Sequence, residues 1–176
     1  MGKDSSDLHA KGAIYRWFKG ELRLLYPNIS IPNAICFTPD GKAAYFGDTA
    51  QQKIWRVVLD AAGWPVGEPA VYLDFTGTEI YPDGSTVDAA GNVWNAQWGS
   101  SRVACYAPDG RFLSEVKVDA PHTSCPAFGG AAMDTLFVTT ALEEMSDAAK
   151  AAFPQSGKVF AFDGVAKGLA EDLVAL

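Results

Sequence analysis

Short runs of alternating apolar and polar residues recur along the chain, and a basic residue accompanies each of them. Four runs align as copies of one pattern: "GAIYRWF" (12–18), "KIWRVVL" (53–59), "RVACYAP" (102–108) and "KVFAFDG" (158–164). The copies are spaced 40, 49 and 56 residues apart, taking as equivalent Ile14, Ile54, Val103 and Val159. Alternation with a period of two is typical of a β-strand with one buried face, so each copy predicts a strand.

A second set of strands precedes three of these copies: "KAAYFGD" (42–48), "GNVWNAQW" (91–98) and "DTLFVTTA" (134–141). Turn-forming residues stand before two of them, at 39–41 and 88–91. Several short strands in each repeat of ~40–50 residues are typical of a β-propeller, whose small sheets must stack to bury both faces. An ordinary β-sandwich remains the alternative, although the repeated basic-aromatic strand favours the propeller. The fold class we expect is therefore all-β.

One segment, around residues 146–153, predicts a helix instead. Ser146 is a good N-cap, four alanines follow it, and Pro154 ends the helix. Three apolar residues fall on one face of it: Met145, Ala149 and Phe153. We interpret it as a surface insertion that packs on its sheet, not as a functional helix.

Chain length and strand pattern together predict a single domain over residues 1–176, with 1–11 as an irregular N-terminal segment. The alternation also predicts which side chains lie in buried layers within or between the sheets. These are Val57, Val87, Val93, Phe128, Leu136 and Val159.

Composition narrows the classes of partner. The net charge of −7 and the pI of about 4.7 argue against nucleic acid or an anionic membrane, since either partner favours a basic face. The three cysteines are Cys36, Cys105 and Cys125; they show no metal-binding spacing and are expected to be reduced, as in a cytoplasmic protein. The first residues lack the apolar region of a secretory signal, and no apolar run approaches the ~18 residues of a membrane helix.

Several familiar catalytic motifs are absent from the sequence, namely G-x-S-x-G, the P-loop, G-x-G-x-x-G after a strand, and H-E-x-x-H. His122 and Cys125 stand close together in "APHTSCPAFGG". A Cys/His nucleophilic pair is conceivable there, but this spacing favours a structured loop.

Two polar residues occupy equivalent places in successive repeats. Asn33 follows a proline in "ISIPNAICF", and Asp83 follows one in "IYPDGSTV". Pro82-Asp83-Gly84 predicts a turn, and both residues are expected just before the innermost strand of their sheet, facing the central channel. An amide oxygen and a carboxylate that meet there suit a hard or borderline divalent ion. The alternative is that both residues only cap loops.

The sequence resembles the SMP-30/gluconolactonase/regucalcin-like family from about Gly12 to about Leu169. Three motifs carry the resemblance: "NAICFTPDG", "PDGSTVDAAGNVW" and "TSCPAFGG". It implies a six-bladed propeller that holds one divalent metal ion (Ca, Zn, Mn, Mg or Fe) in its channel and hydrolyses sugar lactones. By this resemblance Asn33 and Asp83 match metal ligands, Asp83 also matches the catalytic general base, and Asp48 matches an aspartate near the site.

Six blades of ~45 residues need about 270 residues, so the resemblance implies an incomplete propeller of about three and a half to four blades. We expect the chain to match the C-terminal portion of the family. The family's N-terminal glutamate ligand, and its arginine and asparagine that contact substrate, then have no counterpart here. An exposed blade face would allow self-association.

The function we expect is metal-dependent hydrolysis of a small sugar lactone. The alternatives are a non-enzymatic calcium-binding or scaffold propeller, and an inactive truncated fragment.

Overall fold

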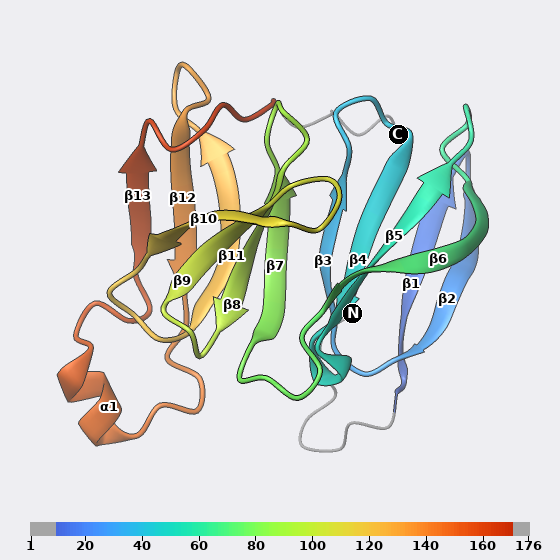
Figure 1. Ribbon diagram of the computed structural model, residues 1–176. Coiled ribbons are helices and arrows are strands. Elements are labelled where there is room, and N and C mark those ends of the chain that lie inside the picture. Colours follow the sequence, from blue (N-terminus) through green and yellow to red (C-terminus); the bar gives the residue numbers. More distant parts are fainter. Residues whose placement is uncertain (1–9, 171–176) are drawn as a thin grey trace.

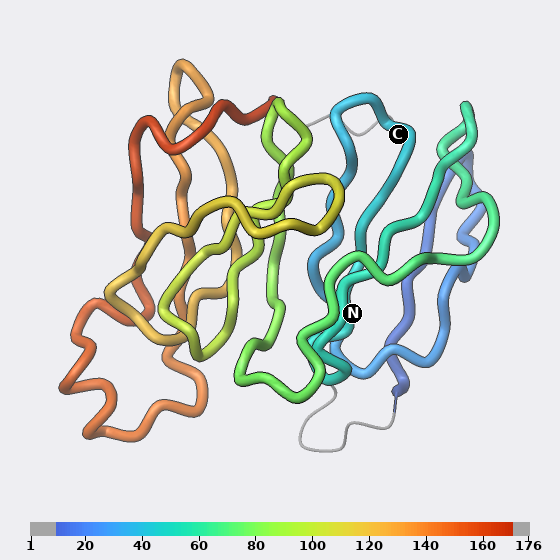
Figure 2. The backbone as a smooth tube through the Cα atoms, viewed as in Figure 1, coloured from blue at the N-terminus to red at the C-terminus, as the bar shows by residue number. Residues whose placement is uncertain are grey.

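Four antiparallel sheets stand side by side and follow one another along the chain (Figures 1 and 2). The computed structural model describes residues 10–170. The first two sheets contain β1 (Gly12–Phe18) and β2 (Glu21–Ile29), then β3 (Pro32–Phe37), β4 (Ala43–Asp48), β5 (Lys53–Leu59) and β6 (Pro65–Asp74). The last two contain β7 (Tyr81–Val87), β8 (Val93–Trp98), β9 (Arg102–Tyr106) and β10 (Phe112–Lys117), then β11 (Thr123–Gly129), β12 (Thr135–Thr140) and β13 (Val159–Asp163).

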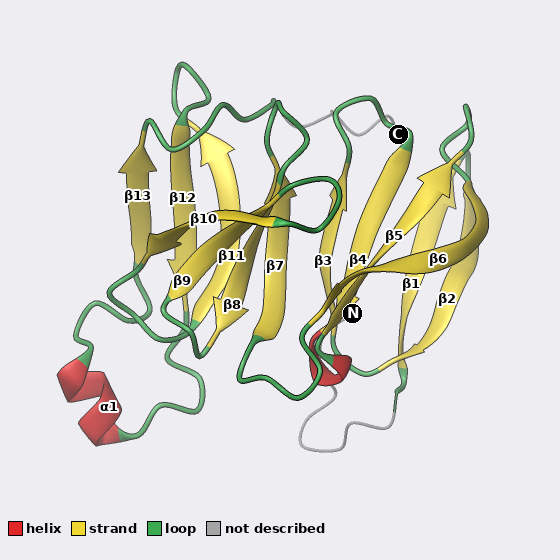
Figure 3. Cartoon of the chain, viewed as in Figure 1, coloured by secondary structure: helices red, strands yellow, loops and turns green. Residues whose placement is uncertain are grey.

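The all-β prediction is confirmed, because helix is confined within the described residues to a short 3-10 turn, η1 (Thr49–Gln51), and to α1 (Asp147–Ala152) (Figure 3). Two sheets have four strands, the first has two and the last has three. This matches the incomplete propeller of about three and a half to four blades. The irregular segment expected at 1–11 lies mostly outside the described residues.

The packing between sheets explains the apolar pattern. One core fills the space between the β3–β6 and β7–β10 sheets and includes Tyr45, Ile54 and Val93. A second core lies between the β7–β10 and β11–β13 sheets and includes Trp94, Leu136 and other buried residues of β8, β9 and β12. β4 is buried at every position because sheets cover both of its faces.

Four of the six residues predicted to be buried are buried: Val57, Val87, Val93 and Leu136. Phe128 is half-buried and packs against the second core. Val159 was predicted wrongly, because its side chain is 63% exposed. Phe160 and Phe162 of β13 turn toward the second core, so Val159 lies on the opposite face, which no further sheet of residues 10–170 covers.

The row of sheets therefore ends in two open apolar faces. The first end face, on β1 and β2, consists of Tyr15, Trp17, Leu22 and Leu24, each at least half exposed. The last end face, on β11–β13, consists of Ala127, Phe137, Val159 and Ala161, all of them exposed. In the interior of the row, β4 is buried on both faces, whereas Ile35 and Phe37 of β3 stay more than half exposed.

Helix α1 forms where the sequence predicted it. The Ser146 hydroxyl accepts a hydrogen bond from the Ala149 N–H (3.2 Å), which caps its first turn. Met145 is buried just before the helix, and Phe153 just after it lines a cavity of about 500 Å³ with Ile80 and Val118. The insertion thus lies beside residues that flank the β7–β10 sheet, and its packing on its own sheet stays a prediction.

Candidate functional site

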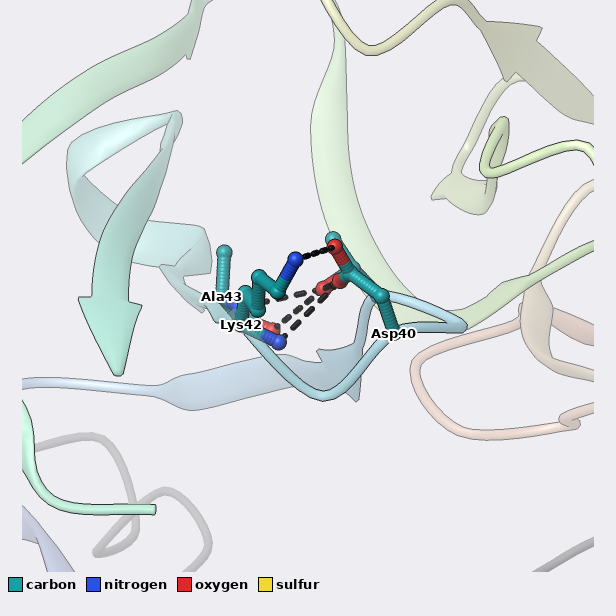
Figure 4. A network of polar contacts seen from close by, with 4 residues as sticks. Asp40, Lys42 and Ala43 are labelled. Atoms are coloured by element: carbon teal, nitrogen blue, oxygen red, sulfur yellow. Dashed lines mark hydrogen bonds and ion pairs between the residues drawn. The ribbon is translucent and has the colours of Figure 1, made fainter. Parts of the chain in front are cut away.

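The tripeptide Pro-Asp-Gly occurs three times in the chain, but the backbone treats one copy differently. Residues 39–41 and 108–110 form turns that join β3 to β4 and β9 to β10, and Gly41 and Gly110 adopt positive φ there. In the first turn, the Asp40 carboxylate accepts hydrogen bonds from the Thr38 hydroxyl (2.7 Å) and the Lys42 N–H (3.1 Å) (Figure 4). Residues 82–84 instead lie within strand β7, so the turn predicted at Pro82-Asp83-Gly84 was wrong.

Strand β7 accommodates these residues through a β-bulge. Pro82 pairs with Gln97 and Ser85 pairs with Asn95, so Asp83 and Gly84 together stand opposite the single residue Ala96. A bulge changes the direction of the side chains it carries. The tripeptide Pro82-Asp83-Gly84 predicted a turn, and a turn and a bulge both interrupt regular strand pairing. The sequence therefore indicated an interruption at the right place but of the wrong kind.

Gly84 is required by the close approach of β7 to β11. A Cβ atom at this position would lie 2.8 Å from Cys125 Sγ, 2.8 Å from the Ser124 carbonyl oxygen and 2.9 Å from Cys125 Cα. Two of these atoms belong to backbone, which cannot rotate away. The missing side chain therefore brings Ser124 next to the Asp83 segment.

The innermost strands of three sheets share this irregularity. β7 lies between β3 and β11 and contacts both (Figure 1), and each of the three strands has a register shift near its first residues. The shifts fall directly after Asn33, across Asp83, and at Ser124. Asn33 and Asp83 thus lie inside their strands, not ahead of them as expected. The three polar residues Asn33, Asp83 and Ser124 therefore lie at the same end of the inner wall, which is the surface formed by β3, β7 and β11.

The Asp83 carboxyl group is partly withdrawn from water, and burial raises its pKa to about 6. Hydrogen bonding from the Ser124 side chain and the Gly84 backbone lowers the pKa against this trend. The charge of Glu143 raises the pKa further, and the Asn33 side chain lowers it. The structure thus brings Asn33 and Ser124 to the Asp83 carboxyl group, which burial makes a stronger base than an ordinary aspartate.

Thr49 joins Asn33 to the segment that carries Asp83. The Asn33 Nδ2 atom donates to Thr49 Oγ1 (2.9 Å), and the Thr49 hydroxyl donates to the Pro82 carbonyl oxygen (2.6 Å). Among the described residues no donor is found at Asn33 Oδ1. The amide nitrogen is therefore held in place while the oxygen is left for another partner.

Asp48 is fully buried and directly precedes Thr49, so it supports the hydrogen bonds of Asn33 and Thr49 from behind without joining them. Its carboxylate accepts hydrogen bonds from four donors, namely the N–H groups of Ser30, Ile31 and Ala50 and the side chain of Gln51. Its oxygens are thereby occupied. Asp48 fixes the segment that leads into Asn33 and caps the η1 turn that begins with Thr49.

The alternative pair of His122 and Cys125 does not form a nucleophilic site. His122 stacks on Trp98 with ring centroids 4.2 Å apart, and no hydrogen bond between His122 and Cys125 is found among residues 10–170. Burial, and then the charge of Asp83, raise the pKa of the Cys125 thiol. An activated cysteine needs the opposite shift.

Sequence reasoning missed Thr49, Ser124 and Glu143 as members of the site. Ser124 stands in "TSCPAFGG", so the motif could be recognised, but the sequence did not show that the Ser124 side chain faces Asp83. Thr49 and Glu143 follow strand ends, and only the fold places them near Asp83. No group of three or more His, Cys, Asp or Glu side chains suited to a metal ion exists among the described residues.

Comparison with known proteins identifies the fold and the motifs together. Residues 1–142 match the model of the SMP-30/Gluconolactonase/LRE-like region. The chain belongs to this family. As an SMP-30/gluconolactonase-like protein it is 46% identical over 169 residues to a Rhizobium meliloti protein named "Putative sugar lactone lactonase", covering 96% of this chain and 57% of that relative.

Two further relatives extend the likeness. An L-arabinolactonase from Azospirillum brasilense is 40% identical over 139 residues, covering 78% of this chain and 45% of the relative. The crystal structure of a calcium-binding protein, regucalcin, from Agrobacterium tumefaciens superimposes with a TM-score of 0.92 at 43% identity, covering 96% of this chain and 57% of the other. The SMP-30/gluconolactonase-like chain thus spans about half the length of the relatives it matches. No helix within residues 10–170 has the length and apolar character needed to cross a membrane.

Proposed function

We propose that this chain carries part of the catalytic site of a divalent-metal-dependent lactonase that acts on sugar lactones. The observation that carries the proposal is the Asp83 carboxylate, which lies beside Asn33 and Ser124 at one end of the inner strands. The similarity to relatives named as lactonases supports the same reaction class.

Asn33 and Asp83 fit a metal site by their chemistry. Both offer hard oxygen atoms, and burial raises the pKa of Asp83, which a divalent cation at that carboxylate would lower. Two protein donors fill only part of the coordination of Ca²⁺, Mg²⁺, Mn²⁺, Zn²⁺ or Fe²⁺, so water or other protein groups must supply the rest. When bound, such an ion polarises the lactone carbonyl and lowers the pKa of water.

The chain's own residues then provide the base. In lactone hydrolysis the oxygen of water attacks the carbonyl carbon, its proton moves to a base, and the ring C–O bond breaks with protonation of the leaving alkoxide. Asp83 accepts the proton of the attacking water in this scheme. Without a bound ion, burial raises the pKa of this carboxyl group to about 6. A divalent cation at Asp83 would lower that pKa, so the value describes the chain without its ion.

A second candidate function is calcium binding without catalysis. The observation that favours it is the name of the Agrobacterium tumefaciens structure, which describes a calcium-binding protein at 43% identity. The same residues, Asn33 and Asp83, would serve it. The two candidates differ in whether a lactone is consumed.

The redox state of the three cysteines indicates the kind of cellular compartment in which the protein works. Cys36 and Cys105 are buried, Cys125 is exposed, and all three are free thiols. Free thiols are typical of a reducing compartment, which supports our proposal of a cytoplasmic protein.

The test is the hydrolysis of gluconolactone, xylonolactone and arabinolactone, followed by acid release in a pH-stat with and without EDTA. We expect very slow turnover by this chain alone, because two oxygen donors hold an ion weakly. We expect EDTA-sensitive turnover when the chain is joined to the part of the Rhizobium meliloti relative that it does not match. Calcium binding by the joined protein without turnover of any lactone would favour the second candidate.

A further inference from the structure

Asn95 is a polar residue in the middle of a core strand. It lies on β8 between Trp94 and Ala96, and its side chain is fully buried. Buried polar groups in proteins nearly always have a specific partner that explains them. The partners of Asn95 lie on the neighbouring strand β7, at the bulge.

The Asn95 amide nitrogen binds the bulge at three points. Nδ2 lies 3.2 Å from the Asp83 carbonyl oxygen, 3.2 Å from the Gly84 carbonyl oxygen and 3.0 Å from Ser85 Oγ. Two of these partners are carbonyls, which can only accept. The orientation of the amide is therefore fixed, with its nitrogen toward the bulge.

This orientation leaves the oxygen of the Asn95 amide without a donor, which is unfavourable in a buried position. Asn95 Oδ1 is buried, and within the described part of the chain it has no hydrogen-bond partner. An apolar side chain would avoid such an orphan acceptor and would suit the surrounding core. The amide is thus explained by its donors and not by its packing.

We propose that Asn95 is a positioning residue that holds the β7 bulge and thereby directs Asp83 toward the end of the inner wall. The inference rests on the function proposed above, since it assigns Asn95 to the same site. The bulge places two residues opposite Ala96, so the ladder between β7 and β8 cannot satisfy both bulge carbonyls in the regular way. Asn95 supplies the donor that the ladder lacks.

Loss of this donor should loosen the bulge. A bulged strand that returns to regular pairing shifts its register by one residue, and a one-residue shift turns the affected side chains to the opposite face. The Asp83 carboxylate would then leave Asn33 and Ser124. Asn95 acts on the site only through Asp83 and touches neither substrate nor metal in this account.

The test compares two buried amides of the same strand. Asn95→Leu removes the donor at the bulge. Gln97→Met is the matched control, because Gln97 is also fully buried on β8 but its Nε2 atom donates to the Tyr106 hydroxyl instead. Asn95→Ser, which keeps a hydroxyl donor, is the conservative variant in case the leucine variant does not fold.

The first readout is the backbone ¹³C carbonyl chemical shift of Asp83 and Gly84, measured by NMR on the whole chain in EDTA. We expect both signals to move in Asn95→Leu, to move less in Asn95→Ser and to stay in place in Gln97→Met. Unmoved signals in Asn95→Leu, or equal movement in both strand variants, would overturn the proposal.

The second readout is Mn²⁺ binding, followed by electron paramagnetic resonance. We expect Asn95→Leu to weaken Mn²⁺ binding at least tenfold relative to the unmodified chain, and Gln97→Met to change it less than twofold. Equal weakening by both variants would contradict the positioning role. If the unmodified chain joined to the unmatched part of the Rhizobium meliloti relative binds no Mn²⁺, the metal part of the proposed function fails, while the carbonyl shifts still decide the role of Asn95.

Discussion

Two aspartates of this chain occupy the same tripeptide and differ in basicity because of where the backbone puts them. Asp40 lies in an exposed turn, where the Thr38 hydroxyl and the Lys42 N–H hold its pKa below the ordinary value (Figure 4). Asp83 lies in a bulged inner strand, where burial raises the pKa to about 6. Pro-Asp-Gly alone does not distinguish these settings; the partner strand does.

The raised pKa of Asp83 makes a prediction about stability in the absence of metal. Because the folded pKa of about 6 exceeds the ordinary 3.8, the folded chain binds this proton more tightly, and stability falls as pH rises through that window. Asp83→Asn should remove the effect. We expect it to stabilise the chain by about 1–3 kcal/mol at neutral pH and by little near pH 4, as measured by urea unfolding in EDTA.

Asp88→Asn is the matched control for that experiment. The Asp88 carboxylate accepts hydrogen bonds from two backbone N–H groups and from the side chains of Asn92 and Trp94. Its replacement should destabilise the chain at neutral pH. If Asp83→Asn were equally destabilising, the Asp83 carboxylate would stabilise the fold, and burial would not be disfavouring its ionised form.

Gly84 provides a second prediction at this scale. Alanine would place a Cβ atom within 2.9 Å of the β11 backbone. We expect Gly84→Ala to cost about 1–3 kcal/mol in urea unfolding and to weaken metal binding, because β7 and β11 must separate. A cost below about half a kcal/mol would show that the two strands are not as close as described.

At the scale of strands, the sequence predicted which residues pair across a sheet better than it predicted which residues a neighbouring sheet buries. Val159 pairs with Thr139 as Ile54 pairs with Gly47 and Val103 with Ala96, which confirms the alignment for these three of the four copies. Burial failed at Val159 because it depends on a neighbouring sheet, which strand periodicity does not report. Helix α1 was predictable because Ser146 and the alanines act locally.

The same limit applies to the site. Asn33 and Asp83 could be named from their motifs, but Thr49 reaches them from the η1 turn and Ser124 from the bulge of β11. Bulges shift register by one residue. Pro82-Asp83-Gly84 indicated a break in regular pairing in β7 but not that it would be a bulge, and no such signal marks the shifts in β3 and β11.

Leu136 and Val159 test this account of β12 and β13. Leu136 is fully buried in the second core, whereas Val159 is 63% exposed on the last end face. We expect Leu136→Ala to cost about 2–5 kcal/mol and Val159→Ala less than about half a kcal/mol in chemical unfolding. Similar costs at both positions would mean that another surface covers the last end face in solution.

For the whole molecule, the two end faces are the features that set its behaviour in solution. Each exposes apolar side chains that interior sheets would bury, and such patches favour association. We expect the chain to self-associate with rising concentration in sedimentation velocity. Trp17→Glu together with Val159→Glu should reduce this association, while Phe112→Glu, at a similarly exposed residue of β10, should not. Association that persists in the double variant would place the contact elsewhere.

The most direct test of the account is the effect of Asp83 on EDTA-sensitive lactone hydrolysis. The protein to use is this chain joined to the unmatched part of the Rhizobium meliloti relative. Asp40→Ala serves as the control, because Asp40 occupies the same tripeptide at an exposed turn. We expect Asp83→Ala to abolish the turnover that EDTA removes, and Asp40→Ala to retain it. Undiminished, EDTA-sensitive turnover in Asp83→Ala would contradict the assignment of Asp83 to the catalytic site.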